Sequence, residues 1–213
     1  MLDKKLQAYL ESLLPSREGL FSEMEDFAGV NHVPIMEPTG MEALLQVLRI
    51  LKPERILEIG TAIGYSALRM AEAIPDARVV TIERDEERFR LALNYIDKSG
   101  YKARVHPILG DALEVSDKVS GFAPFDALFI DAAKGQYQKF FALYEPYLRT
   151  GGVLVTDNVL FKGLVYNEQN DNKRLAKLAE KIHGYNLWLT SQEGFETTIL
   201  PIGDGVAISY KRG

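Results

Sequence analysis

The stretch "ILEIGTAIGYSALRM" (56–70) runs from an apolar segment through two glycines into a helical pattern. Ile56, Leu57 and Ile59 suit a strand that is covered on both faces. Gly60 and Gly64 permit a tight turn and a close approach of the backbone to a ligand, although a plain left-handed turn would also explain them. The stretch therefore predicts a first strand–helix turn with room for a ligand beside it.

The same alternation of strand and helix continues along the chain, and it predicts a parallel sheet with helices on both faces. Apolar, β-rich runs lie at 55–60, 77–83, 103–110, 125–131 and 152–157, with amphipathic helical stretches near 64–74, 85–99, 111–120 and 134–148.

The two ends of the chain differ from this middle part. Helical spacing predicts three opening helices, at roughly 2–14, 16–30 and 38–51, and a polar helix near 172–190. The runs 195–203 and 205–212 share the turn "GDG" and predict a terminal hairpin. We expect one α/β domain over residues 1–213, in which helices at about 1–51 precede a mostly parallel, seven-stranded sheet with an antiparallel C-terminal strand.

Composition limits the classes of function. The 213 residues are 46% hydrophobic with a net charge of −5, which suits one sizeable core. The chain has no cysteine, which excludes disulfides, zinc–thiolate sites and cysteine nucleophiles and favours a cytoplasmic location. No apolar run approaches membrane-spanning length, and the N-terminal stretch lacks the pattern of a signal peptide.

An acid stands at or next to the end of every predicted parallel strand. A single acid there is usually a helix cap, but the carboxyl ends of parallel strands share one edge of a sheet. Five carboxylates gathered at that edge repel one another unless a cation or a polar ligand relieves them. The acids are Glu58, Glu83, Asp111, Asp131 and Asp157.

The first three of these acids indicate the type of ligand. The glycine pattern departs from the dinucleotide fingerprint G-x-G-x-x-G, and Glu58 would repel a pyrophosphate, so a dehydrogenase is disfavoured. A ligand with a positive centre fits better. Glu83 is placed to accept hydrogen bonds from a ribose diol, or it is a solvated acid beside Arg84.

These residues resemble the class I S-adenosylmethionine-dependent methyltransferases, whose fold is Rossmann-like. The resemblance implies that the E-x-G-x-x-x-G motif holds the methionine part, that the acid after the second strand holds the ribose, and that the acid after the third lies by the adenine. The cofactor-binding residues implied are Met36, Glu58, Gly60, Ser66, Glu83, Asp111, Ala112 and Asp131.

The segments "FIDAAKGQY" (129–137) and "VTDNVLFKG" (155–163) add a second set of polar residues. Asp131, Asp157 and Asn158 would offer two carboxylates and an amide oxygen at neighbouring strand ends, a donor set that suits Mg²⁺. Alternatively, Asp157 and Asn158 only turn the chain. A helix N-terminus and a nearby Mg²⁺ would both disfavour a protonated Lys134, which suits a general base, whereas most lysines are solvated surface residues.

Both segments resemble the cation-dependent O-methyltransferases, which include the catechol and caffeoyl-coenzyme A enzymes. The resemblance implies that Asp131, Asp157 and Asn158 bind the metal, that Lys134 is the base, and that the chain forms a homodimer. The overall pattern is most similar to bacterial tRNA 5-hydroxyuridine methyltransferases, which act on the wobble base of the anticodon loop.

The net charge argues against an RNA partner unless basic residues are concentrated locally. The stretch 172–181, Lys162 and the tail 210–212 are candidate basic patches, or solvated surface. Tyr137, Tyr166 or Phe161 could stack on a flipped base, or belong to the core or a dimer contact. We expect 161–172 to form a mobile lid over the substrate. A small catechol-like substrate and a noncatalytic binding module remain the alternatives.

Overall fold

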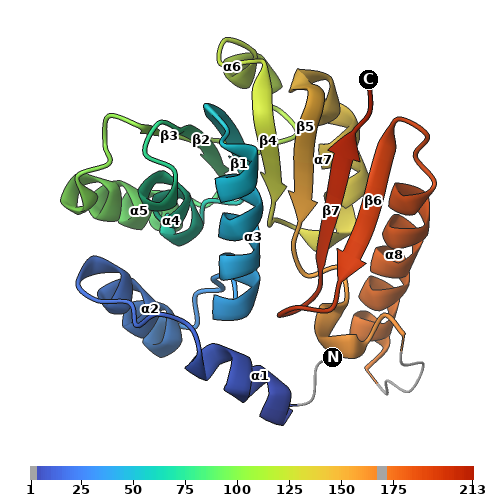
Figure 1. Cartoon of the computed structure of the whole chain (residues 1–213), viewed down its shortest axis with the longest axis horizontal. Coiled ribbons are helices and arrows are strands. Elements are labelled where there is room, and N and C mark those ends of the chain that lie inside the picture. Colours follow the sequence, from blue (N-terminus) through green and yellow to red (C-terminus); the bar gives the residue numbers. More distant parts are fainter. Residues whose placement is uncertain (1–3, 167–171) are drawn as a thin grey trace.

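A computed structural model describes residues 4–166 and 172–213, and these form one seven-stranded sheet flanked by helices (Figure 1). The strand order is β3-β2-β1-β4-β5-β7-β6. Strands β1 to β5 are parallel, whereas β7 runs antiparallel to both β5 and β6. The predicted mixed sheet with an antiparallel C-terminal strand is confirmed. Its strands are β1 (Arg55–Ile59), β2 (Arg78–Glu83), β3 (Val105–Leu109), β4 (Phe125–Ile130), β5 (Leu148–Thr156), β6 (Phe195–Leu200) and β7 (Val206–Lys211).

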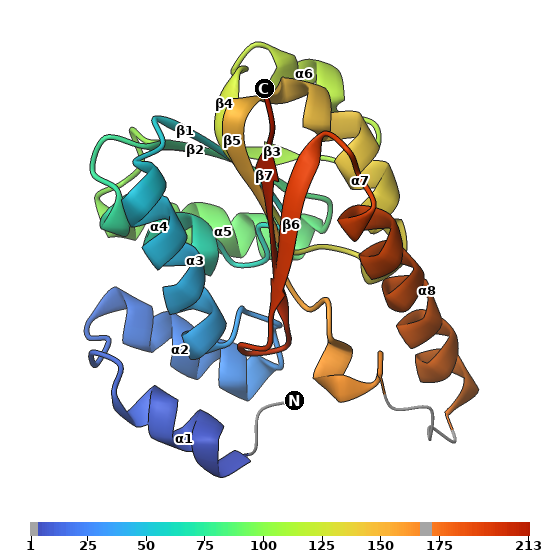
Figure 2. The same ribbon diagram turned by 45° about the vertical axis from the view of Figure 1, so that its right-hand side comes forward.

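Helices cover both faces of the sheet, as Figure 2 shows with α3, α4 and α5 on one side and α7 and α8 on the other. Side chains alternate along each strand, so consecutive residues pack into different cores. Leu57 of β1 belongs to the core under α7 and α8, and its neighbour Ile56 belongs to the core under α3 and α4. The helices are α1 (Lys4–Ser12), α2 (Leu20–Asn31), α3 (Pro38–Leu51), α4 (Tyr65–Ala73), α5 (Glu86–Ser99), α6 (Ser116–Ser120), α7 (Tyr137–Tyr144) and α8 (Lys173–Thr190).

Two predicted helices are shorter than the sequence indicates. In the stretch 111–120 the Asp111 carboxylate accepts a hydrogen bond from the Leu113 amide, which fixes a turn, and only α6 is helical. The stretch 134–148 divides into the 3₁₀ turn η1 (Lys134–Gln136), α7 and the 3₁₀ turn η2 (Glu145–Tyr147). Gly135 weakens the helix at its start and Pro146 cannot continue it at its end.

The carboxyl ends of β1 and β4 form the switch point of the sheet. From β1 the chain proceeds outward through β2 and β3, and it then returns to β4 on the other side of β1. Open α/β sheets bind ligands at this point, because the two connections leave in opposite directions and open a crevice. The topology therefore places any ligand beside the ends of β1 and β4.

No helix in the described ranges is long and apolar enough to cross a membrane. That the chain forms a single domain stays a prediction.

Candidate active site

A cavity of about 590 Å³ lies at the carboxyl edge of the sheet, over the switch point. Residues from the ends of β1 to β5, from the segment before α3 and from the β6–β7 turn line it. Every residue that the sequence predicts for the site lines this cavity, except Glu58. Those that line it are Met36, Gly60, Ser66, Glu83, Asp111, Ala112, Asp131, Lys134, Asp157 and Asn158.

Gly60 joins the two sides of the cavity. Its φ of +109° lies in the region that favours glycine, and a Cβ atom there would lie 1.9 Å from the carbonyl oxygen of Asp131. The Asp131 amide in turn donates to the Ile59 carbonyl, with a donor–acceptor distance of 3.0 Å. The glycine is therefore required both for the turn and for contact between the ends of β1 and β4.

Glu58 lies beneath the cavity floor with no exposed surface. Its two carboxylate oxygens accept hydrogen bonds from the hydroxyls of Ser66 and Thr81, and the Thr81 hydroxyl also contacts that of Thr61. Burial raises the pKa of Glu58 to about 7. Glu58 therefore does not line the cavity itself, whereas its partner Ser66 does and can contact a ligand. Thr81 was not expected from the sequence, although its polar side chain inside an apolar strand was a signal that could have identified it.

Glu83 is fixed by the backbone around it. One carboxylate oxygen accepts from the amide of Ala62 at 2.8 Å, and the other accepts from the amides of Arg84 and Asp85, each at 2.9 Å. Only 8% of Glu83 is exposed, so it is not a solvated acid beside Arg84. Three backbone donors hold the carboxylate in place before any ligand arrives.

Asp131, Asp157 and Asn158 come together at the ends of β4 and β5. Asp157 is 2% exposed, and it accepts from the backbone amide of Asn158 at 2.7 Å and from its side-chain amide at 3.1 Å. Burial raises the pKa of Asp157 well above its usual range, and the neighbouring Asp131 raises it further. Burial likewise raises the pKa of Asp131. Asp157 is buried and Asp131 is partly buried, and two carboxylates that resist ionisation in this way favour a cation between or beside them.

Lys134 lies at the start of η1, against this pair of acids. Its Nζ donates a hydrogen bond to Oδ1 of Asn158. The positive charge of Lys134 partly offsets the effect of burial on both Asp131 and Asp157. The structure thus brings the predicted base and the predicted metal-binding residues into one cluster.

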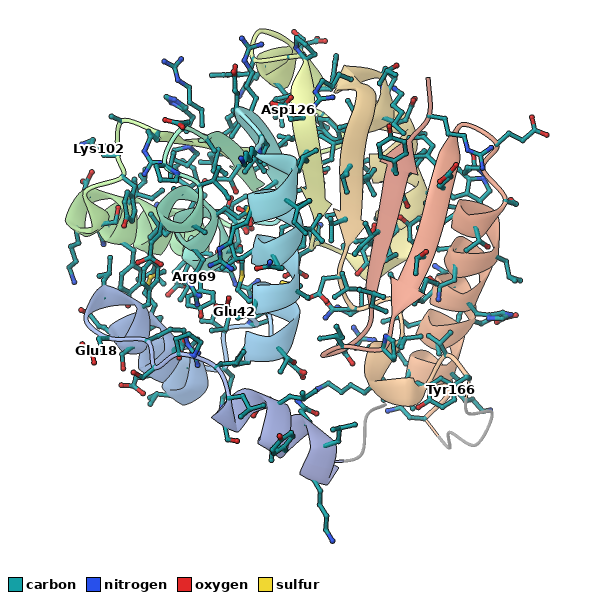
Figure 3. All side chains as sticks on the ribbon, viewed as in Figure 1. Glu18, Glu42, Arg69, Lys102, Asp126 and Tyr166 are labelled. Atoms are coloured by element: carbon teal, nitrogen blue, oxygen red, sulfur yellow. The ribbon has the colours of Figure 1, made fainter. Side chains whose placement is uncertain are left out.

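Tyr65 connects the cavity to the N-terminal helices. Its ring lines the cavity, while its hydroxyl donates to Glu25 of α2 and accepts from Arg69 at 2.9 Å. Arg69 is 5% exposed and pairs with Glu42 of α3, which is labelled beside it in Figure 3. Burial, followed by the hydrogen bond to Glu25, raises the pKa of Tyr65. The network fixes α2 and α3 against the start of α4.

The aromatic residues proposed for stacking have different environments. Phe161, in the 3₁₀ turn η3 (Phe161–Gly163), lines the cavity, and Tyr166 is 60% exposed (Figure 3). Tyr137 is only 1% exposed, its hydroxyl donates to the Asp157 carbonyl at 2.9 Å, and its ring centroid is 5.1 Å from that of Tyr185. A stacking role for Tyr137 is therefore wrong, because the ring is core. Residues 167–171 of the predicted lid lie outside the described residues.

The predicted basic stretches lie in different parts of the molecule. Near the cavity, Lys162 is part of the lining, and a Cβ atom at Gly135 would lie 3.9 Å from Nζ of Lys181 on α8. The tail 210–212 lies toward the opposite edge of the sheet, because Nζ of Lys211 donates to the carbonyl of Leu148 at the start of β5, at 2.9 Å. Lys211 pairs there with Glu145 at 2.6 Å and Arg212 pairs with Glu196 at 3.2 Å, so the tail forms no basic patch beside the site.

The lining residues that were not expected from the sequence include three polar ones that bear on the chemistry. Glu37 precedes α3, Asp204 lies in the β6–β7 turn, and Thr61 follows β1. Burial raises the pKa of Glu37, and the carboxylate of Asp204 adds to the effect. "GDG" was assigned to a hairpin turn, and only the return of β7 alongside β5 brings that turn to the cavity.

Comparison with known proteins agrees with this geometry. Residues 17–212 match the family model described as O-methyltransferase. A catechol O-methyltransferase from Niastella koreensis is 33% identical, over 82% of this chain and 80% of its own. The crystal structure of a Staphylococcus aureus protein shares 37% identity and a TM-score of 0.92, covering 98% of this chain and 100% of its own.

A further solved structure bears on the ligand. An O-methyltransferase from Bacillus cereus, solved with S-adenosylhomocysteine, is 25% identical with a TM-score of 0.84, covering 98% of this chain and 97% of its own. The match to the family model extends over nearly the whole chain and includes every lining strand. The chain therefore belongs to the S-adenosylmethionine-dependent O-methyltransferase family.

Proposed function

We propose that this protein transfers the methyl group of S-adenosylmethionine to a hydroxyl that has a second oxygen beside it, with a divalent cation such as Mg²⁺ bound at the site. The observation that carries the proposal is the convergence of Asp131, Asp157 and Asn158 with Lys134 at one side of the cavity. The other side, formed by the ends of β1 to β3, offers Ser66, Glu83 and Asp111 to the cofactor. A noncatalytic binding module would have no need of Lys134 beside one buried and one partly buried acid.

The donor set fits a hard divalent cation. Carboxylate and amide oxygens are its preferred ligands, and the raised pKa values of Asp131 and Asp157 indicate that their charge is not fully compensated. In the described part of the chain, no group of three or more His, Cys, Asp or Glu residues is placed to hold a metal ion, and the proposed set contains only two such residues, Asp131 and Asp157. Asn158 Oδ1 accepts from Lys134, so a cation bound there would compete with that ammonium.

The residues of the chain then have separate tasks. Ser66 and Glu83 orient the cofactor, and the close contact between Gly60 and Asp131 keeps the cofactor side next to the acceptor side. To act as the base, Lys134 would accept the proton of the attacking hydroxyl at Nζ, a step that requires the amine form of the side chain. A cation bound by Asp131, Asp157 and Asn158 would supply Lewis-acid polarisation of the two neighbouring substrate oxygens.

We propose 5-hydroxyuridine at the wobble position of tRNA as the substrate, since its O5 and O4 are adjacent. The basic half of α8 supports an RNA partner despite the net charge of −5. Its exposed cations lie on one helical face that begins beside η1, and in the described ranges none of them forms an ion pair. Glu180 is the one acid of the helix. These cations are Lys173, Arg174, Lys177 and Lys181.

A small catechol is the second candidate, and the name of the Niastella koreensis relative favours it. The same residues would act on either substrate, because both present two adjacent oxygens. The candidates differ in their need for α8, which a molecule confined to the cavity would not contact.

Methyl transfer from labelled S-adenosylmethionine tests the proposal directly. The protein is given tRNA that carries unmethylated 5-hydroxyuridine and, in parallel, a catechol, each with Mg²⁺ and with excess chelator. We expect label at the wobble base only when Mg²⁺ is present. Label in the catechol alone would keep the chemistry and overturn the RNA substrate, and label that persists in chelator would overturn the cation.

We also propose a cytoplasmic homodimer. Apolar side chains on α1 and directly after it support the dimer, since Leu6, Tyr9 and Leu13 are between 43% and 61% exposed. Light scattering after gel filtration would test it, and the mass of a single chain, 23.9 kDa, would contradict it.

A further inference from the structure

The segment 158–164, which we call the post-β5 loop, has an unfavourable backbone. Asn158, Phe161 and Lys162 have φ values of +58°, +46° and +54°, in the left-handed region that residues other than glycine rarely adopt. The loop carries one proposed cation ligand, Asn158, and two cavity-lining residues, Phe161 and Lys162. Contacts from outside the loop must offset the cost of this conformation.

The β6–β7 turn (201–205) supplies those contacts. The amide of Val159 donates to the Gly205 carbonyl at 3.0 Å, and the amide of Leu160 donates to the Asp204 carbonyl at 2.9 Å. The side chain of Asp204 then accepts from the backbone amide of Lys162. The turn therefore holds three of four consecutive loop amides.

Asp204 is the side chain on which this contact depends. It is 9% exposed, and its carboxylate is directed to a backbone donor. Gly205 has to lack a side chain, because its Cβ atom would lie 2.6 Å from the backbone nitrogen of Leu160. On the other side of the loop, the Asn186 amide of α8 donates to the Val159 carbonyl at 2.8 Å.

We propose that Asp204 is a positioning residue for methyl transfer, which acts by holding the post-β5 loop through the Lys162 amide. Held in this way, the loop presents Asn158 to Lys134 and Asp157 and keeps Phe161 and Lys162 on the cavity wall. The inference rests on the proposed function only where Asn158 is taken as a cation ligand. The hydrogen bonds from the turn to the loop do not depend on that role.

Two variants separate the hydrogen bond from the charge. Asp204→Ala removes the acceptor, whereas Asp204→Asn keeps an oxygen that can accept from the Lys162 amide. Amide hydrogen exchange of residues 158–164, followed by mass spectrometry, reports the loop without substrate or metal. The affinity for S-adenosylhomocysteine and kcat/KM for the methyl acceptor complete the comparison, and Asp76→Ala, at an exposed site between α4 and β2, is the control.

We expect Asp204→Ala to accelerate exchange of loop amides and to lower kcat/KM by about ten- to a hundredfold, with affinity for S-adenosylhomocysteine within about twofold of wild type. Asp204→Asn should restore loop protection and most of the activity. Unchanged loop exchange in Asp204→Ala would overturn the proposal. An inactive Asp204→Asn variant with a protected loop would also overturn it, because methyl transfer would then depend on the negative charge of Asp204 and not on the hydrogen bond to the loop.

Gly205→Ala provides an independent test if Asp204→Ala does not fold. Its methyl group displaces Leu160, so the same loop amides should exchange faster while Asp204 is intact. Protection equal to that of wild type would contradict the proposed contact. If neither the wild type nor any variant transfers a methyl group but the exchange pattern is as expected, the proposed function fails. The contact by which Asp204 holds the loop would then still stand.

Discussion

The two sides of the cavity lie at the same edge of the sheet, but they differ in how far the protein itself provides hydrogen-bond donors to their acids. On the cofactor side, Glu83 accepts three backbone hydrogen bonds and Glu58 accepts two from hydroxyls. On the acceptor side, burial raises the pKa of both Asp131 and Asp157, and the charge of Asp131 raises the pKa of Asp157 further. The acceptor side also contains three non-glycine residues with left-handed backbone, whereas Ala62 is the corresponding residue near the cofactor.

This difference separates what each side needs from a ligand. The cofactor side is organised by its own backbone, so binding there costs little rearrangement. On the acceptor side, a bound cation would stabilise the charged form of the two acids. The loop on that side is held by a turn that is distant in sequence. We therefore expect substitutions on the acceptor side to reduce methyl transfer and those on the cofactor side to change binding or stability.

The largest expected effect is at Asp157. Asp157→Ala removes the more deeply buried of the two acids, and we expect methyl transfer to fall by at least about a thousandfold. Affinity for S-adenosylhomocysteine, measured by calorimetry, should stay within about threefold of wild type if the two sides are independent. Activity that survives in this variant would remove the basis for the cation mechanism.

Gly60→Ala should break the separation, because Gly60 touches both sides. Its methyl group would meet the Asp131 carbonyl at 1.9 Å, so we expect the free energy of unfolding to fall by roughly 3 kcal/mol and both binding and transfer to weaken. Gly29→Ala on α2 is the matched control, since no atom lies within 4 Å of the position that its methyl group would take and helix propensity favours alanine. Equal urea midpoints for the two variants would show that the close contact does not matter.

Glu58 gives the cofactor side a pH dependence. Its pKa is about 7 in the folded protein against an ordinary 4.5, so its contribution to stability is present below pH 4.5 and is lost as pH rises toward and through 7. Relative to Glu58→Gln, the wild type should lose up to about 3 kcal/mol of unfolding free energy between pH 5 and pH 8. Urea denaturation of both proteins across this range measures it, and a constant difference would mean that Glu58 does not titrate there.

The smallest effect concerns α8 and only one substrate. The double variant Lys177→Glu/Lys181→Glu should raise KM for tRNA by about tenfold at low salt and leave catechol methylation unchanged, because the phosphates alone require this face. Lys102→Glu/Lys118→Glu makes the same change in net charge at the opposite edge of the sheet and serves as the control (Figure 3 labels Lys102). An equal loss in both double variants would indicate a general charge effect.

The sequence by itself determined the fold class and most of the site. Apolar runs alternating with amphipathic stretches require a covered parallel sheet, and an acid at the end of each run is brought to one edge by that geometry alone. Asp131 and Asp157 could therefore be placed together from their positions in the chain. Local chemistry also fixed the turn at Gly60, where only glycine tolerates the backbone.

Tertiary structure decided what depends on contacts between distant segments. Tyr137 has an aromatic ring that could stack on a base, but packing against Tyr185 places it in the core. Glu58 reads as a site residue, but the hydroxyls of Ser66 and Thr81 hold it beneath the floor of the cavity. Asp204 reads as a hairpin residue and reaches the cavity only because β7 returns beside β5. Periodicity encodes which face of an element is apolar, whereas burial and partners are set by the order in which the strands assemble.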